Sequence, residues 1–197
     1  MPGYQSYKNA RDAAWQFLID NRVTELPLKF SDICRSMGIS LDQYRGKRFF
    51  EQDERGMSYR KDGVYHILLK GTDDRRVQRY TIGHELGHIY LGHLSGGGAH
   101  TRLTGTRSEP RARREYEAER FAMGILAPAC VLWGLGVRTA GDIVQLCDIS
   151  LEDARYRAER MRMLYKRERF LTKDLEKQVY AQFEDYIKST VAASREE

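Results

Sequence analysis

The segment H-E-L-G-H at residues 84–88 places two histidines four positions apart, with a glutamate directly after the first. Residues four apart lie on the same face of an α-helix, so both imidazoles can reach one metal ion. A catalytic zinc ion needs three protein ligands and leaves one position for water. Zinc lowers the pKa of such a water towards about 7, and a neighbouring carboxylate can accept its proton. We therefore expect Zn2+ bound by His84 and His88, with Glu85 as the catalytic base.

The residues around this motif predict a single helix over 75–91. The turn before it, Gly71 to Asp74, contains a helix N-cap. Gly83 and Gly87 are poor helix formers, so their presence indicates close packing or access for a metal. His93 lies five residues beyond His88, about 140° around the helix if it continues. We expect His93 to be a surface histidine, and a supporting role near the site is the alternative.

A third ligand must come from elsewhere in the chain. The segment 113–126 predicts a second strong helix, which Pro128 ends. It offers Glu115, Glu117 and Glu119, and a glutamate on a second helix is a common way to complete such a site. Helical geometry does not choose among the three, since each has apolar neighbours three or four positions away.

The remaining patterns predict an α+β fold. Strands are expected at 39–44, 57–59 and 64–69, and the dipeptide Asp62-Gly63 is a strong hairpin signal between the last two. We expect a mostly helical protein whose small three-stranded antiparallel sheet packs beside the H-E-x-x-H helix. C-terminal helices follow it, at 139–146, 151–165 and 171–187.

Three parts of the chain follow from this pattern. Residues 1–135 are expected to form a zincin-like metallopeptidase domain. Residues 136–190 are expected to form a helical extension packed on it, with a helix-turn-helix-like pair of helices. Residues 191–197 are expected to form a disordered tail, because chain ends are poorly ordered unless they are packed.

Composition agrees with a globular protein of the cytoplasm. Hydrophobic residues make up 41% of the chain and charged residues 31%. No signal peptide or membrane-spanning segment is expected, because the apolar runs are short and interrupted. Three cysteines without C-x-x-C spacing indicate buried free thiols. The net charge of +5 and the basic run over 155–169 allow nucleic-acid binding, although a solvated helix face is favoured.

Two segments together resemble the ImmA/IrrE family of metallopeptidases. They are RYTIGHELGHIYLGH at 79–93 and EYEAERFAMGILAP at 115–128. The preceding strands and the segment IVQLCDISLEDARYRAERM at 143–161 fit the family's layout, so the resemblance covers roughly residues 10–165. It implies that His84 and His88 bind zinc, that Glu85 is the base and that Glu117 is the third ligand.

The resemblance also implies a cytoplasmic enzyme that cuts a helix-turn-helix repressor protein. The chain departs from the family pattern at Tyr80, Gly83, Glu119 and Ala127. Glu119 stands where the family has asparagine, so the second motif can shift by two residues, with Glu115 and Glu119 as the alternative ligands. Two other functions compete with proteolysis: a non-proteolytic zinc-binding regulator, such as part of a toxin–antitoxin pair, and a DNA-binding regulator.

Overall fold

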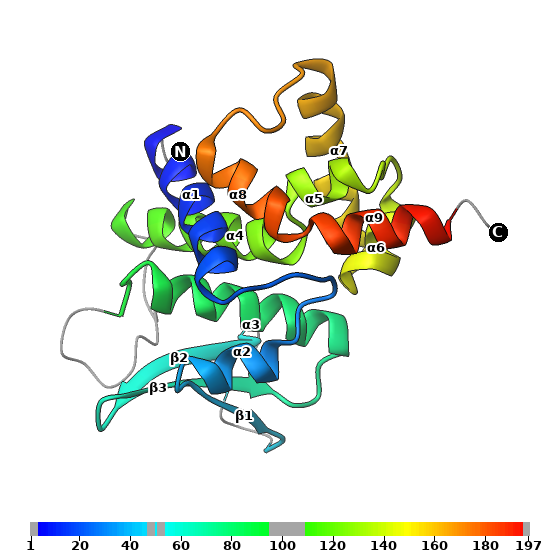
Figure 1. Ribbon diagram of the computed structural model, residues 1–197. Coiled ribbons are helices and arrows are strands. Elements are labelled where there is room, and N and C mark those ends of the chain that lie inside the picture. The colour runs from blue at the N-terminus through cyan, green and yellow to red at the C-terminus, as the bar shows by residue number, and fades with distance from the viewer. Residues whose placement is uncertain (1–3, 47–49, 51–53, 95–108, 195–197) are drawn as a thin grey trace. The chain divides into compact units, whose positions relative to one another are not determined.

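The computed structural model describes residues 4–46, 50, 54–94 and 109–194 (Figure 1). The chain is mostly helical with one small sheet, which confirms the expected fold class. Its elements in chain order are α1 (Tyr4–Asp20), α2 (Phe30–Ser36), β1 (Ser40–Tyr44), β2 (Gly56–Lys61), β3 (Val64–Lys70), α3 (Arg75–Tyr90), α4 (Glu109–Leu126), α5 (Ala129–Gly134), α6 (Ala140–Cys147), α7 (Leu151–Lys166), α8 (Asp174–Gln182) and α9 (Glu184–Ala193).

The chain forms two compact units. The first comprises Met1–Ala13 and Lys29–Ala122, and the second comprises Ala14–Leu28 and Met123–Glu197. The domain boundaries predicted after residues 135 and 190 stay a prediction. Helix α9 continues to Ala193, so the expected tail begins as helix, and residues 195–197 lie outside the described residues. Among the described residues, no helix is both long and apolar enough to cross a membrane.

The sheet of the first unit has the strand order β1-β3-β2. Strands β2 and β3 form the predicted hairpin, and both turn residues, Asp62 (φ 49°) and Gly63 (φ 83°), lie in the left-handed region. That conformation matches a two-residue hairpin turn. Strand β1 runs parallel to β3, so the prediction of an antiparallel sheet is wrong for this pair. Strand β3 lies in the middle of the sheet, paired with β1 on one side and with β2 on the other.

Helix α3 lies along the sheet and contacts β2 and β3 (Figure 1). Its first turn is capped by the side chain of Asp74, which accepts a hydrogen bond from the N–H of Arg76 at 2.8 Å. Leu86 is fully buried on α3, as are Ile67 and Leu69 on β3. Because α3 contacts β3, burial of these apolar side chains holds the helix, and with it the H-E-x-x-H motif, against the sheet.

Gly87 lets α4 come close to α3. A Cβ at this position would lie 3.1 Å from Cα and 3.2 Å from the carbonyl oxygen of Ala118, which is tighter than ordinary packing. The close packing expected from the glycines of the motif is therefore found at Gly87. It brings the first turns of α4 next to the histidines.

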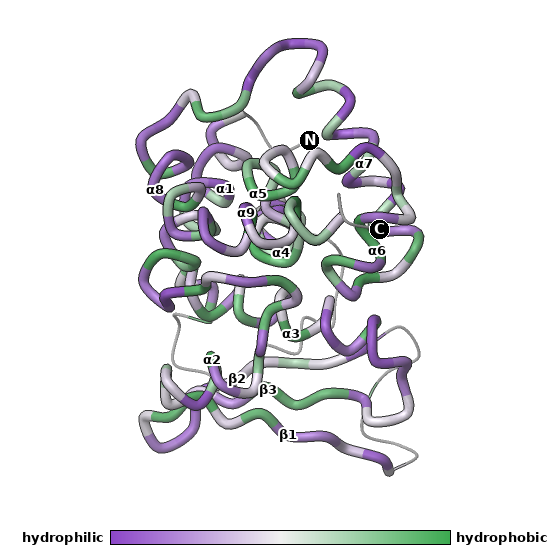
Figure 2. The backbone as a smooth tube through the Cα atoms, turned by 45° about the vertical axis from the view of Figure 1, so that its right-hand side comes forward, coloured by the Kyte–Doolittle hydropathy of each residue, from purple (hydrophilic) through white to green (hydrophobic). Residues whose placement is uncertain are grey.

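In the second unit, α6 and α7 contact each other and are joined by a short turn. Thr139 caps α6 and Ser150 caps α7, and Asp148 between them adopts the left-handed conformation (φ 51°). Figure 2 shows α7 as mostly hydrophilic with short hydrophobic stretches. Arg157 of the basic run is buried and donates to the carbonyl of Met123, so this arginine belongs to the packing of the unit.

Candidate metal centre

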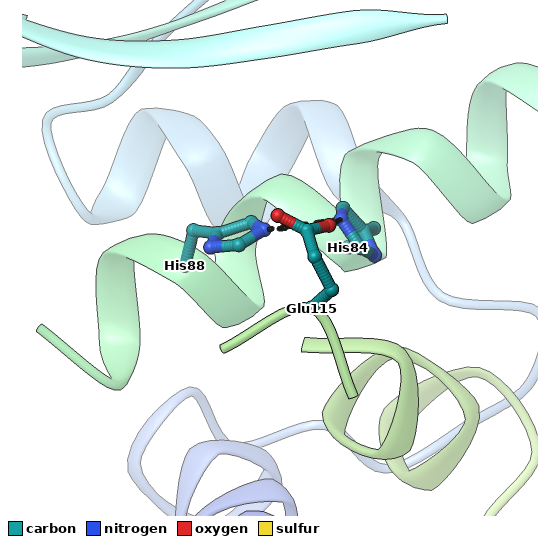
Figure 3. Close-up of side chains that lie close together, drawn as sticks. All are labelled: His84, His88 and Glu115. Atoms are coloured by element: carbon teal, nitrogen blue, oxygen red, sulfur yellow. Dashed lines mark hydrogen bonds and ion pairs between the residues drawn. The ribbon is translucent and has the colours of Figure 1, made fainter. Parts of the chain in front are cut away.

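Three side chains from α3 and α4 converge on one point (Figure 3). Nε2 of His84 and Nε2 of His88 lie 3.1 Å apart. Oε2 of Glu115 lies 3.2 Å from Nε2 of His84 and 3.7 Å from Nε2 of His88. The two histidines are one helical turn apart on α3, and Glu115 reaches them from the start of α4.

These spacings match the donor set of a tetrahedral metal ion. Ligand atoms about 2.0–2.1 Å from zinc at tetrahedral angles lie about 3.3 Å from one another. The three observed separations between ligand atoms, 3.1, 3.2 and 3.7 Å, are close to that distance. Two imidazole nitrogens and one carboxylate oxygen are also a usual ligand set for catalytic zinc. The residues therefore fit a metal ion by geometry and by chemistry.

The charges around the site favour a cation. Burial opposes protonation of His84, but its hydrogen bond to Glu115 and the charges of Glu85, Glu115 and Glu119 outweigh this and raise its pKa. Burial likewise opposes ionisation of Glu115, yet hydrogen bonds from His84 and His88 hold the pKa of this carboxyl well below its ordinary value. Surroundings that stabilise a positive imidazole also stabilise a bound metal cation.

The predicted base, Glu85, lies beside this centre and is held by the sheet. Its side chain is buried, and Oε2 accepts a hydrogen bond from Oγ of Ser58 on β2 at 2.6 Å. Such a hydrogen bond to a carboxylate fixes its orientation. No sequence motif marks Ser58, because its contact with Glu85 arises only when β2 packs against α3.

Glu117, which the family resemblance implied as third ligand, lies in different surroundings. Its Oε1 accepts from Nε of Arg113 at 2.9 Å, and its Oε2 lies 3.2 Å from Nε2 of His93. Hence the structure brings His84 and His88 together with Glu115, one of the two alternatives, and not with Glu117. Residues two apart do not share a helix face, which is why Glu115 and Glu117 reach different groups.

His93 is buried and not on the surface, so the expectation of a surface histidine is wrong. Its Nδ1 lies 3.1 Å from Nδ1 of His88. Burial, together with the nearby His88, lowers the pKa of His93 to about 4 despite its hydrogen bond to Glu117. Its imidazole is therefore neutral at neutral pH. The signal that could have located it is Gly92, since a glycine after the last turn commonly ends a helix.

Other side chains near the motif have separate contacts. The ring of Tyr80 stacks against His84 with 6.3 Å between the ring centroids. The Glu119 side chain is partly exposed and lies 3.9 Å from Arg120. His66 stacks on Tyr59, on the neighbouring strand.

The site thus has a pair of histidines on one helix, an acidic residue on the next helix and a buried glutamate beside the pair, and the three converging side chains could hold a metal ion. Residues 39–159 match the model of the Peptidase_M78 family, described as the IrrE N-terminal-like domain. The chain belongs to this peptidase family, which confirms the resemblance to ImmA/IrrE metallopeptidases. A comparison with curated proteins gave no match.

Proposed function

We propose that this chain is a zinc-dependent endopeptidase in which His84, His88 and Glu115 bind the metal and Glu85 is the general base. One observation carries the proposal: three ligand atoms converge beside a buried glutamate on the same helix. Membership of a peptidase family supports the reaction class. Zinc is favoured among divalent metals because imidazole and carboxylate ligands at these spacings suit it.

When bound, the metal supplies a Lewis acid that polarises a peptide carbonyl and makes water acidic enough to react near neutral pH. The carboxylate of Glu85 accepts the proton of the attacking water and delivers it to the departing amide nitrogen. Ser58 holds this carboxylate through its hydrogen bond to Oε2. Placing the base in advance removes part of the entropic cost of the reaction.

We propose that the substrate segment binds in an extended form along the outer edge of β2. Within the described residues, β2 pairs with β3 alone, and no described strand pairs with its other edge. Peptides commonly add to such an edge through main-chain hydrogen bonds. Because Ser58 of β2 holds the base, this edge lies closer to the chemistry than β1 does.

The proposed substrate is a helix-turn-helix repressor protein in the cytoplasm, as the resemblance to ImmA/IrrE metallopeptidases implies. The test uses the repressor encoded nearest to the gene for this chain, as an intact protein, and a peptide library made from a cell lysate. The zinc-loaded protein should cut the repressor at a defined bond, and Glu85→Gln should bind zinc but not cut.

The outcomes separate the parts of this proposal. Cleavage of library peptides without cleavage of the repressor would support the proposed peptidase activity and reject the repressor as its substrate. A zinc-loaded protein that cuts neither would favour the non-proteolytic zinc-binding regulator. Equal cleavage by Glu85→Gln would reject the role of Glu85, because a base that accepts the proton of water cannot be replaced by an amide.

A further inference from the structure

Two buried side chains beside the metal centre, His93 and Glu117, take no part in the proposed hydrolysis. Both are less than a tenth exposed. His93 lies between His88 and Glu117, with its Nδ1 3.1 Å from Nδ1 of His88 and its Nε2 3.2 Å from Oε2 of Glu117. Burying polar groups costs free energy unless they are hydrogen-bonded, so this row of three side chains needs matching donors and acceptors.

The end of α3 places His93 against His88. Gly92 adopts the left-handed conformation (φ 71°). The N–H of Gly92 bonds to the carbonyl of Ile89 at 3.1 Å, and that of His93 bonds to the carbonyl of His88 at 2.9 Å. These two hydrogen bonds form a Schellman motif, which ends a helix and leads the chain back over its last turn. His93 is thereby folded back onto His88 by the backbone itself.

Glu117 is fixed at the other end of the row. Its Oε1 accepts a hydrogen bond from Nε of Arg113 at 2.9 Å, one turn earlier on α4. The Ser6 hydroxyl also bonds to this carboxylate. The remaining oxygen, Oε2, faces His93. A carboxylate held on both sides gives the His93 imidazole a fixed partner.

If Nε2 of His88 binds a metal, the positions of the protons on the His88 and His93 rings follow. Nδ1 of His88 then carries the proton and donates to Nδ1 of His93, because a neutral imidazole has one donor and one acceptor. His93 in turn carries its proton on Nε2 and donates to Glu117. Every polar ring atom in the row therefore has a matching partner. His84 differs, since its buried Nδ1 has no hydrogen-bond partner among the described residues.

We propose that His93 and Glu117 form a positioning pair that holds the His88 imidazole with Nε2 directed at the metal. The proposal rests on the proposed metal site. Partners of this kind fix the tautomer and the orientation of a ligating histidine, and their loss weakens metal binding by about 10–100-fold. His93 and Glu117 act through His88 and do not touch the substrate or the metal.

Two substitutions of His93 separate hydrogen bonding from space filling. Asparagine places its carbonyl oxygen near the position of Nδ1 and can accept from His88, whereas glutamine places its amide near Nε2 and can reach only Glu117. Zinc affinity, measured by competition with a chromophoric chelator, should fall about 10–100-fold in His93→Gln and stay within about 3-fold in His93→Asn. His66→Gln and His66→Asn, on β3, are the matched controls and should leave the affinity unchanged.

A second measurement does not depend on bound metal. Long-range proton–nitrogen spectra of the metal-free protein should show His93 protonated on Nε2, the tautomer that accepts from His88 and donates to Glu117. A proton on Nδ1 of His93 would overturn the proposal, as would a His93→Gln variant that binds zinc as tightly as His93→Asn. If the unaltered protein takes up no zinc, the proposed function fails, and the tautomers alone decide whether the positioning pair exists.

Discussion

Oγ of Ser58 on β2 donates a 2.6 Å hydrogen bond to Oε2 of Glu85 on α3, 27 positions further along the chain. Both side chains are buried. This contact ties the proposed base to the same strand whose outer edge is proposed to receive the substrate. A substrate bound to β2 would thus be in register with Glu85, because one strand positions both of them.

The Ser58→Ala variant should cut the repressor about 10-fold more slowly than the unaltered protein. A hydrogen bond to a carboxylate contributes about 1.5 kcal/mol, which corresponds to about tenfold in rate. Zinc affinity should not change, since Ser58 is not a ligand. Ser40→Ala is the matched control, because Ser40 lies on β1 and bonds to exposed Asp42. A full rate in Ser58→Ala would mean that Glu85 keeps its position without the serine.

Alanine substitutions along α4 should identify the third ligand. Glu115→Ala should weaken zinc binding more than 100-fold, because a direct ligand is lost. Glu117→Ala should weaken it by about 3–10-fold, between His93→Asn and His93→Gln, because Glu117 acts on the metal only through His93 and His88. Glu119→Ala should have the smallest effect, since Glu119 acts on the site only through its charge and its partly exposed side chain lies beside Arg120. Chelator competition measures all three. A larger loss in Glu117→Ala than in Glu115→Ala would restore Glu117 as the ligand.

Local patterns in the sequence predicted the parts of the structure that depend on near neighbours. The pair of histidines follows from the helical repeat, and the hairpin follows from Asp62-Gly63. The parallel pairing of β1 with β3 joins residues about 26 positions apart, such as Ser40 and His66. Nothing in either strand records its direction in the sheet, because side chains alternate between the two faces in the same way in parallel and antiparallel pairs.

The parts of the site that the sequence did not predict depend on how α3 and α4 meet. Glu115 and Glu117 have similar neighbours in the sequence, and only the approach of the two helices at Gly87 decides which carboxylate reaches the histidines. The role of Ser58 also depends on packing, since this serine meets Glu85 only because β2 packs on α3. His93 is different, because Gly92 gave a local signal that the helix ends before it.

The Gly87→Ala variant should be less stable, although alanine favours helices by about 1 kcal/mol over glycine. The added Cβ would lie 3.1 Å from Cα and 3.2 Å from the carbonyl oxygen of Ala118, and backbone atoms can yield only if the helices separate. Overpacking of this kind costs about 1–3 kcal/mol. We expect a lower melting temperature and weaker zinc binding, because the separation moves Glu115 away from the histidines.

The matched control is Gly141→Ala on α6, where the new Cβ would meet only Oγ1 of Thr139, at 3.6 Å. Without a clash, the preference of alanine for helix should raise stability by up to about 1 kcal/mol. Thermal unfolding followed by circular dichroism measures both variants. Equal stabilisation by the two substitutions would contradict the close approach of α3 and α4 at Gly87.

The three cysteines should resist thiol reagents while the protein is folded. Cys34, Cys130 and Cys147 are buried and are not in disulfides, as the sequence predicted. Burial raises the pKa of the Cys34 thiol to about 11 and that of Cys130 to about 12. The thiolate is the reactive form, so a raised pKa leaves both thiols protonated and unreactive at pH 8. Unfolding exposes the thiols and returns their pKa values to about 8.5.

A disulfide reagent at pH 8 should therefore modify no cysteine in the native protein and all three in denaturant. Rapid modification of the native protein would mean that the helices carrying these cysteines open readily.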